Sequence, residues 1–291
     1  MNKTQSLVWV CIAYMVALYI AGCSLFFLSF DPLWNILIAD IVATFVIFLF
    51  SRHFKNSSFY DAYWTVIPPF IALYWMLTAT IEAPVIRQML VLLVLLFWAT
   101  RLTLNWATYW EGMVHEDWRY KLLRDSAPKC SVLIDFFAIH LFPTMQVFLG
   151  LLPIYAIYHL GNESLNIIDI IAFIVAMAAI IIQMFSDFQL HDFIKNKKAG
   201  ETLKHGLWAW SRHPNYFGEL GFWFGLFLFG CAAYPAGTYW IGAGFIAMLA
   251  MFVFASIPMM EKRSLQRRPE YQETIDTVSM FIPLPPKNKK G

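Results

Sequence analysis

Eight long apolar runs restrict the fold of this sequence more than any other feature. A helix needs about 20 apolar residues to cross the hydrocarbon core of a bilayer, and only helices or closed barrels cross it with every backbone group hydrogen-bonded. Hydrophobic residues make up 59% of the 291 residues and charged residues only 14%. We therefore predict an all-α, polytopic membrane helix bundle with about eight transmembrane helices, at residues 7–28, 34–50, 62–81, 85–107, 132–160, 167–190, 216–233 and 238–259.

The placement of basic residues predicts the orientation of this bundle. Lys and Arg gather in the cytoplasmic loops of membrane proteins. With eight spans, all of the 21 Lys and Arg residues except Arg87 and Arg101 fall on one side of the membrane, the side that also holds both termini. Both termini are therefore predicted to be cytoplasmic. Because the basic residues are spread over five segments, no nucleic-acid partner is indicated.

The cysteines and the absence of a linker-like stretch in the sequence favour one membrane domain without a metal site. Cys11, Cys23, Cys130 and Cys231 show no CxxC or ligand-like spacing, so neither zinc nor disulfides are expected. No repeat or Pro/Gly/Ser-rich linker divides the chain.

We predict a multi-pass protein of the bacterial inner membrane, or of the endoplasmic reticulum if the source is eukaryotic.

The stretch 205–219, with the sequence HGLWAWSRHPNYFGE, crowds polar groups against the start of a predicted span. A proline disfavours helical geometry in the residue before it and suits the first helical turn itself, so a helix should begin at Pro214, after His213. Free backbone N–H groups at a helix start attract anions. We expect a phosphate site there, built from the N–H groups of Asn215, Tyr216 and Phe217 and the side chains of Arg212 and Lys204.

An interfacial anchor is an equally good interpretation of this stretch. Arg212 would then meet lipid headgroups, and Trp208 and Trp210 would belong to the aromatic belt at the membrane surface. A charged group that enters the bilayer costs about 2.5 to 3.5 kcal/mol on insertion scales, which favours a ligand that compensates the charge. The spacing alone leaves both interpretations open.

Two more spans carry polar side chains near their cytoplasmic ends. In the sixth span Gln183 and Asp187 are four residues apart, and in the fourth span Arg101 and Asn105 are too, so each pair shares one helix face. Polar faces in membrane helices usually meet a cavity or a partner helix. The alternatives are an interhelical hydrogen bond for Gln183 and, for Arg101, an ion pair with Asp61, Glu111 or Glu116.

The predicted topology brings polar residues from different spans to one level. They lie in or beside the cytoplasmic half of the membrane, whereas the outer half holds few polar residues. One cavity that opens to the cytoplasm explains this better than separate accidents, and its expected contents are a charged soluble cofactor and a lipid-like substrate. The residues are Asp61, Arg101, Asn105, His140, Asp187, Asn215, Glu219 and Glu261.

Several motifs resemble the steroid 5-alpha-reductase family, especially its bacterial-type branch of uncharacterised (DUF1295) proteins. They are SRHPNYFGE at 211–219, SDFQL at 186–190, DAYW at 61–64 and EDWRY at 116–120. The resemblance covers roughly residues 61–286. We accordingly divide the chain into an N-terminal transmembrane pair, 1–60, and a membrane catalytic domain, 61–291.

The resemblance implies an NADPH-dependent reductase of a carbon–carbon double bond conjugated to a carbonyl, in a sterol or another lipid enone. Asp61 resembles the acidic position that faces the substrate carbonyl, and Arg101 would organise that acid as a second catalytic residue. Membrane lipids would be the other partners. The expected cofactor-binding residues are Gln183, Asp187, Lys204, Arg212, His213, Asn215, Tyr216, Glu219 and Glu261.

Three positions depart from the animal enzymes of that family. Asp61 replaces a Glu, Gln183 replaces an Asn, and Trp98 stands where those enzymes place a substrate-facing Tyr. Steroid specificity is therefore not carried over.

Two other functions remain open at this stage. Membrane methyltransferases that use S-adenosylmethionine on isoprenylated cysteine share an RHPxYxG core, which residues 212–218 also satisfy. A non-catalytic lipid-binding protein with the same fold is the third possibility. Binding of S-adenosylmethionine or of NADPH to the purified protein distinguishes them.

Overall fold

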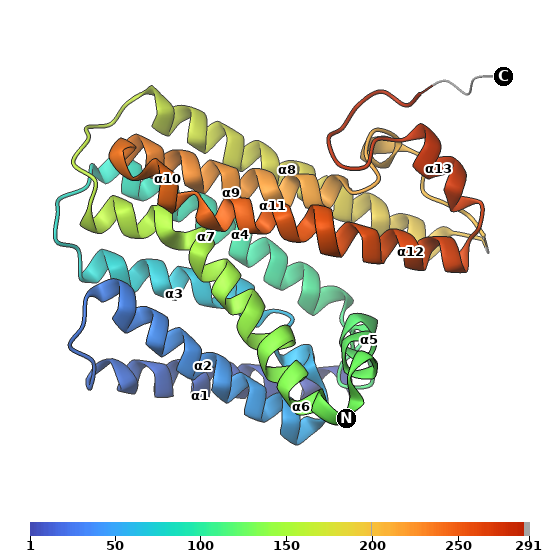
Figure 1. The fold of residues 1–291 in the computed structure, drawn as a ribbon, viewed down its shortest axis with the longest axis horizontal. Helices are drawn as coiled ribbons and strands as arrows, with labels where there is room; N and C mark the ends of the chain where they lie inside the picture. The colour runs from blue at the N-terminus through green and yellow to red at the C-terminus, as the bar shows by residue number, and fades with distance from the viewer. Residues whose placement is uncertain (199, 288–291) are drawn as a thin grey trace.

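The computed structural model describes residues 1–198 and 200–287, and in this part of the chain every regular element is helical. The long helices run side by side in one bundle (Figure 1). The helices are α1 (Lys3–Leu25), α2 (Pro32–Phe54), α3 (Tyr63–Leu77), α4 (Val85–Tyr109), α5 (Trp118–Ser126), α6 (Ser131–Ile134), α7 (Phe142–His159), α8 (Ile167–Asn196), α9 (Pro214–Ala233), α10 (Thr238–Ile241), α11 (Ala243–Met251), α12 (Ile257–Arg267) and α13 (Tyr271–Thr277).

All eight predicted spans are helical, and seven helical segments are long and apolar enough to cross a membrane. Two of the seven are composite, because a π-helical segment, Asp135–Leu141, joins α6 to α7 and another, Phe252–Ser256, joins α11 to α12. The eighth, α3, has 15 residues, about 22 Å at 1.5 Å per residue, so it is shorter than the hydrocarbon core. Exposed large side chains such as Met89 and Phe254 fit contact with membrane lipids.

The two ends of the bundle differ in what they carry. The N-terminus, α5 and α13 lie at one end, on the right of Figure 1, and the turns α1–α2, α3–α4 and α7–α8 lie at the other. We call the first the basic end, because it holds the Lys- and Arg-rich segments between the helices. The shared position of the described chain ends fits an even number of crossings. That the basic end faces the cytoplasm stays a prediction.

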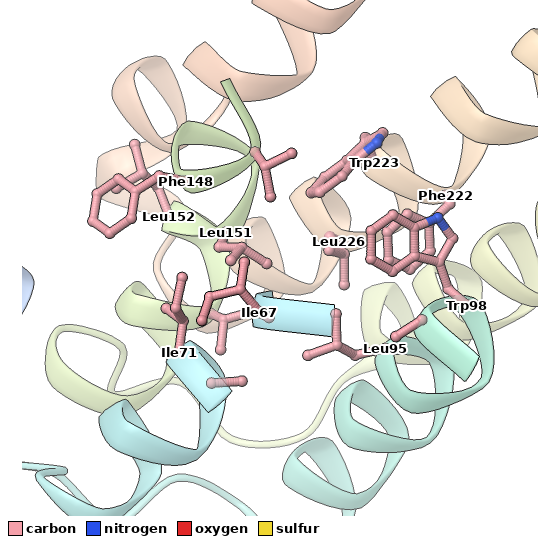
Figure 2. Close-up of a cluster of buried hydrophobic side chains, with 14 of the residues drawn as sticks. Ile67, Ile71, Leu95, Trp98, Phe148, Leu151, Leu152, Phe222, Trp223 and Leu226 are labelled. Atoms are coloured by element: carbon pink, nitrogen blue, oxygen red, sulfur yellow. The ribbon is translucent and has the colours of Figure 1, made fainter. Parts of the chain in front are cut away.

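A cluster of buried apolar side chains joins α3, α4, α7 and α9 in the middle of the bundle (Figure 2). Trp98 of α4 stacks on Phe222 of α9, with ring centroids 4.5 Å apart, and meets Trp223 edge to face at 5.3 Å. Leu151 of α7 and Leu95 of α4 are fully buried in the same cluster. This packing fixes the rotation of α4 and α9 about their own axes.

Helices α8 and α9 pack closely because small residues line their contact. A Cβ atom added to Gly225 would lie 2.6 Å from Cβ of Ala176, and one added to Gly218 would lie 2.7 Å from the carbonyl oxygen of Ala179. Such small-residue contacts let the backbones of membrane helices approach. We call this contact the small-residue seam. It brings the polar residues of α8 within reach of those of α9.

The prediction that the end opposite the basic end is poor in polar groups is wrong. Arg87 of α4 and Asp169 of α8 form a bidentate ion pair there, with N–O distances of 2.7 and 2.9 Å. Their side chains are 1% and 0% exposed. Arg87 also donates to the carbonyl oxygens of Glu163, Ser164 and Ala232. Because pairing and backbone acceptors satisfy the guanidinium, the protein can bury it.

The small-residue seam predicts a sharp contrast between two glycines. Gly225→Ala should lower the free energy of unfolding by about 1 to 3 kcal/mol, because the added methyl group overpacks the seam. A Cβ atom at Gly22 meets nothing within 4 Å, so Gly22→Ala should be neutral or stabilising by up to about 1 kcal/mol. Thermal unfolding of the detergent-solubilised variants measures both, and equal melting temperatures would contradict the seam.

Candidate functional site

The carboxylate of Glu219 is the centre of a buried polar cluster between α4, α8 and α9. Its Oε1 accepts a hydrogen bond from the indole of Trp223 at 2.9 Å. Its Oε2 accepts from the indole of Trp98 at 3.1 Å and from the amide of Gln183 at 2.7 Å. Glu219 is 4% exposed. Three N–H donors thus allow an acidic side chain to lie among apolar helices.

One helical turn closer to the basic end, Asp187 of α8 joins α4 and α9. Nη1 of Arg101 donates to Oδ2 of Asp187 at 2.8 Å, and the amide of Asn215 lies 3.4 Å from the other carboxylate oxygen. The side chains of Arg101 and Asp187 are 8% and 13% exposed. The structure thus brings five predicted site residues together: Arg101, Gln183, Asp187, Asn215 and Glu219.

The sequence suggested that Arg101 organises Asp61, but the structure pairs Arg101 with another acid. Arg101 forms an ion pair with Asp187, and it forms none with Asp61, Glu111 or Glu116 among the described residues. The physical reason is the small-residue seam together with the rotation of α4, which places Asp187 against the same face of α4 that carries Arg101. Arg101 therefore belongs with the predicted cofactor residues.

The two Arg–Asp pairs that join α4 to α8 differ in how completely their groups are bonded. Arg87 directs each of its guanidinium nitrogens to an acceptor. Nε and Nη2 of Arg101, by contrast, are buried without a hydrogen-bond partner in the described part of the chain, and so is Oε1 of Gln183. Buried polar groups are nearly always hydrogen-bonded. These three atoms mark a place where a ligand can supply an acceptor and a donor.

Asp61, at the basic-end start of α3, lies in a second cluster. Its Oδ1 accepts a hydrogen bond from the hydroxyl of Tyr120 on α5 at 2.5 Å. Burial raises the pKa of Asp61 above its usual value, the Tyr120 hydrogen bond opposes that rise, and Asp117 adds to it. The carboxyl group is thereby poised to keep its proton at higher pH than an ordinary aspartate does.

Arg119 connects the two clusters electrostatically. Its guanidinium holds Asp117 through hydrogen bonds of 3.0 and 2.8 Å, and its charge acts on both Asp61 and the hydroxyl of Tyr216. The charge of Asp187 also acts on Tyr216. The charges of Arg119 at α5 and of Asp187 on α8 therefore both reach Tyr216.

Arg212, His213 and Glu261 form a clamp on the C-terminal segment. Arg212 Nε donates to Glu261 Oε1 at 2.6 Å, and His213 Nε2 lies 3.2 Å from the same oxygen. Nη1 of Arg212 donates to the carbonyl oxygens of Ile275 and Val278. Most of the hydrogen-bonding capacity of Arg212 is thus committed inside the protein. Its aromatic neighbour Tyr216 stacks on His213 and Phe252, 5.6 and 4.8 Å away.

The start of α9 partly matches the sequence expectation. The helix begins at Pro214, as predicted. The backbone N–H groups are less available than expected, because that of Tyr216 donates to Oδ1 of Asn215 and that of Phe217 to the carbonyl of His213. Lys204 lies apart, in an exposed ion pair with Glu273 at 2.9 Å. The expected phosphate cradle of three free N–H groups is therefore not formed.

Sequence reasoning missed three hydrogen-bond donors of the two clusters. Trp98 and Trp223 lie in apolar runs, where an indole side chain is usually assigned to apolar packing. Tyr120 is on α5, far from Asp61 in the sequence. A signal was present for one of them. Trp223 follows Glu219 by four residues, which places the two on one helix face.

The chain belongs to the family described as "Protein of unknown function (DUF1295)", which matches residues 47–278. This family is related to the steroid 5-alpha-reductase-like proteins. A similar protein is an uncharacterized protein of Schizosaccharomyces pombe, 27% identical over 254 residues that cover 79% of this chain and 73% of the yeast protein. No solved structure matches the chain.

The clamp predicts a local effect of Arg212→Ala. Loss of its bonds to Glu261, Ile275 and Val278 should release the C-terminal segment, so limited proteolysis after residue 268 should become at least several-fold faster. Lys204→Ala is the matched control, because that side chain is exposed and exposed ion pairs contribute little, about 0 to 1 kcal/mol. Equal proteolysis of the two variants would show that the clamp does not hold the segment.

Proposed function

We propose that the protein is an integral-membrane, NADPH-dependent reductase of a carbon–carbon double bond conjugated to a carbonyl in a lipid substrate. One observation carries the proposal: Arg101 Nε and Nη2 and Gln183 Oε1 are buried and unbonded among the described residues, whereas every guanidinium nitrogen of Arg87 has an acceptor. Membership of a family related to steroid 5-alpha-reductase-like proteins supports it.

The unbonded atoms suit the two polar parts of a nicotinamide dinucleotide. The guanidinium of Arg101 is a donor for phosphate oxygens, with Asn215 beside it. Oε1 of Gln183 is an acceptor for the N–H of a carboxamide, and Glu219 holds the Gln183 amide in place. NADPH, when bound, supplies a hydride for the beta carbon of the enone. Asp187 keeps Arg101 in position from the opposite side.

Asp61 is the residue of this chain that best suits the substrate carbonyl. Its raised pKa favours the protonated form, and a protonated carboxyl group can donate a hydrogen bond to the oxygen on which negative charge develops. Tyr120 donates to Oδ1, and in the proposal Oδ2 makes that contact. The acid lies just before α3, the proposed cofactor residues come from α4, α8 and α9, and the charge of Arg119 acts on both Asp61 and Tyr216.

The motif shared with the isoprenylcysteine methyltransferases gives no preference between the two enzyme classes. Arg212 and His213 bind Glu261 and the C-terminal segment, so their presence supports a common way of folding that segment. The predicted roles of Lys204, Arg212, His213, Tyr216 and Glu261 are accordingly proposed as positioning of the cofactor wall. Direct contacts are assigned to Arg101, Gln183 and Asn215, while Asp187 and Glu219 hold Arg101 and Gln183 in place.

The proposal predicts NADPH binding that depends on Arg101. Quenching of tryptophan fluorescence in purified, detergent-solubilised protein measures it. Arg101→Gln should weaken NADPH binding by roughly tenfold or more, because hydrogen bonds to charged groups are worth about 1.5 to 3 kcal/mol, and Gln183→Met should weaken it by about two- to tenfold, because a neutral hydrogen bond is worth about 0.5 to 1.5 kcal/mol. Asp187→Asn and Asn215→Ala should weaken it in the same direction.

The other Arg–Asp pair supplies the matched control. Arg87→Gln should lower the melting temperature, because it leaves Asp169 buried without its partner, while the folded protein keeps its NADPH affinity. If that variant fails to fold, Gly225→Ala provides a destabilised variant with both pairs intact. Unchanged NADPH binding by Arg101→Gln would remove the residue from the site. Binding of S-adenosylmethionine in place of NADPH would assign the protein to the methyltransferases.

The acid role of Asp61 predicts a specific pH dependence. With a test enone such as a 3-oxo-4-ene steroid, NADPH oxidation should fall as the pH rises through the pKa of Asp61, because the active form is protonated. Tyr120→Phe should move that fall to higher pH, since the hydrogen bond from Tyr120 lowers the pKa of Asp61. Asp61→Asn should bind NADPH and lose most of the turnover. Full turnover by Asp61→Asn would exclude the acid role.

A further inference from the structure

A second region of the molecule, in the N-terminal helices, has a buried acidic group beside a cavity. A cavity of about 200 Å³ lies between α1, α2 and α3. Its lining is almost entirely apolar and includes Leu18, Gly22, Ile36 and Ile71. Phe70 also lines it and is 45% exposed, so the cavity reaches the side of the bundle, where lipid would lie.

The exception in this lining is Asp40 of α2. It is 2% exposed, and it comes eight residues after Pro32, about 12 Å along the helix axis, within the depth of the hydrocarbon core. The hydroxyl of Tyr63 donates to its Oδ1 at 2.8 Å. In the described part of the chain no group donates to Oδ2. An ionisable residue at this depth usually marks a binding site or a pathway.

The residues that line the cavity indicate which class of molecule it would bind. A cavity with one carboxyl group and otherwise apolar walls suits a hydrocarbon body with one small polar group. A hydroxyl fits best, because it can donate to an ionised carboxylate or accept from a protonated one, whereas a second carboxylate would be repelled. A water cluster needs two to four polar partners for each molecule, and the lining offers only Asp40 and Tyr74.

We propose that the cavity between α1, α2 and α3 binds a lipid alcohol, with its hydroxyl group on Asp40 and its hydrocarbon body against α1 and α3. The site is separate from the proposed NADPH site, because none of its lining residues belongs to the Glu219, Asp187 or Asp61 clusters. Asp40 and α1 also lie outside the family match at 47–278. The proposal therefore stands or falls independently of the reductase function.

Photolabelling of the full-length protein in detergent micelles tests the proposal. The probes are hexadecan-1-ol with a diazirine in its chain and the matched diazirine hexadecane without the hydroxyl group. The alcohol should label residues 18–25 and 67–74, read by mass spectrometry of the peptides, and it should label them at least fivefold more than the hydrocarbon does, since only the alcohol can form a hydrogen bond with Asp40.

Two variants separate the hydroxyl contact from the space for the chain. Asp40→Leu should reduce labelling by the alcohol to the level of the hydrocarbon. Gly22→Leu should reduce labelling by both probes, because its side chain extends into open space and fills the cavity while Asp40 stays intact. Cys11→Leu, at an exposed position of the same helix, should label like the wild type.

Three outcomes would overturn the assignment: equal labelling by the alcohol and the hydrocarbon, labelling that survives Asp40→Leu, or labelling that survives Gly22→Leu. NADPH binding by the same two variants should equal that of the wild type. A loss of NADPH binding in either variant would contradict the independence of the two sites, and a failure of NADPH binding in the wild type would leave the lipid result unaffected.

Discussion

The close approach of α8 and α9 is the constraint on which the polar site depends. Neither Gly218 nor Gly225 could carry even a methyl group without moving its neighbour. At that separation a glutamine on α8 reaches a glutamate on α9, and Asp187 reaches Asn215. A wider spacing would break the hydrogen bond between Gln183 and Glu219 and separate Asp187 from Asn215, and each buried polar group that loses a partner costs free energy. The small-residue seam thus permits the charges, and the charges in turn fix the register of the two helices.

In our proposal, the completeness of hydrogen bonding separates a structural ion pair from a binding one at the two Arg–Asp pairs between α4 and α8. Burial alone does not, because both pairs are largely inaccessible. Arg87 meets its acid in a bidentate contact and takes backbone carbonyls for its remaining donors, as expected of a group whose only task is to hold three segments together. Nη1 of Arg101 donates to Asp187, whereas its Nε and Nη2 are buried without a hydrogen-bond partner in the described part of the chain. Buried donors without an acceptor destabilise the fold unless another molecule supplies the acceptor.

Hydropathy was enough to predict the helical class and the positions of the eight helical segments, and the conformational preference of proline predicted the beginning of α9 at Pro214, because each depends on local sequence. The choice of Asp187 as the partner of Arg101 could not be predicted, since it depends on helix rotation and on a separation set by glycines elsewhere. The donor role of Trp98 was hidden for a different reason. An indole is mostly apolar surface with one N–H, and only the position of a carboxylate decides whether that N–H matters.

The difference between complete and incomplete hydrogen bonding also limits what a shared motif can establish about function. The Arg212–His213 pair is the most recognisable part of the resemblance to two enzyme classes, yet its atoms bind Glu261 and the carbonyl groups of the C-terminal segment. A motif that closes the basic end of a helix bundle can accompany different chemistries on the same framework. The discriminating residues are those whose bonding the protein itself leaves incomplete. The proposed cofactor site is therefore built on Arg101 and Gln183, which have buried atoms without a hydrogen-bond partner in the described part of the chain, and not on the shared motif.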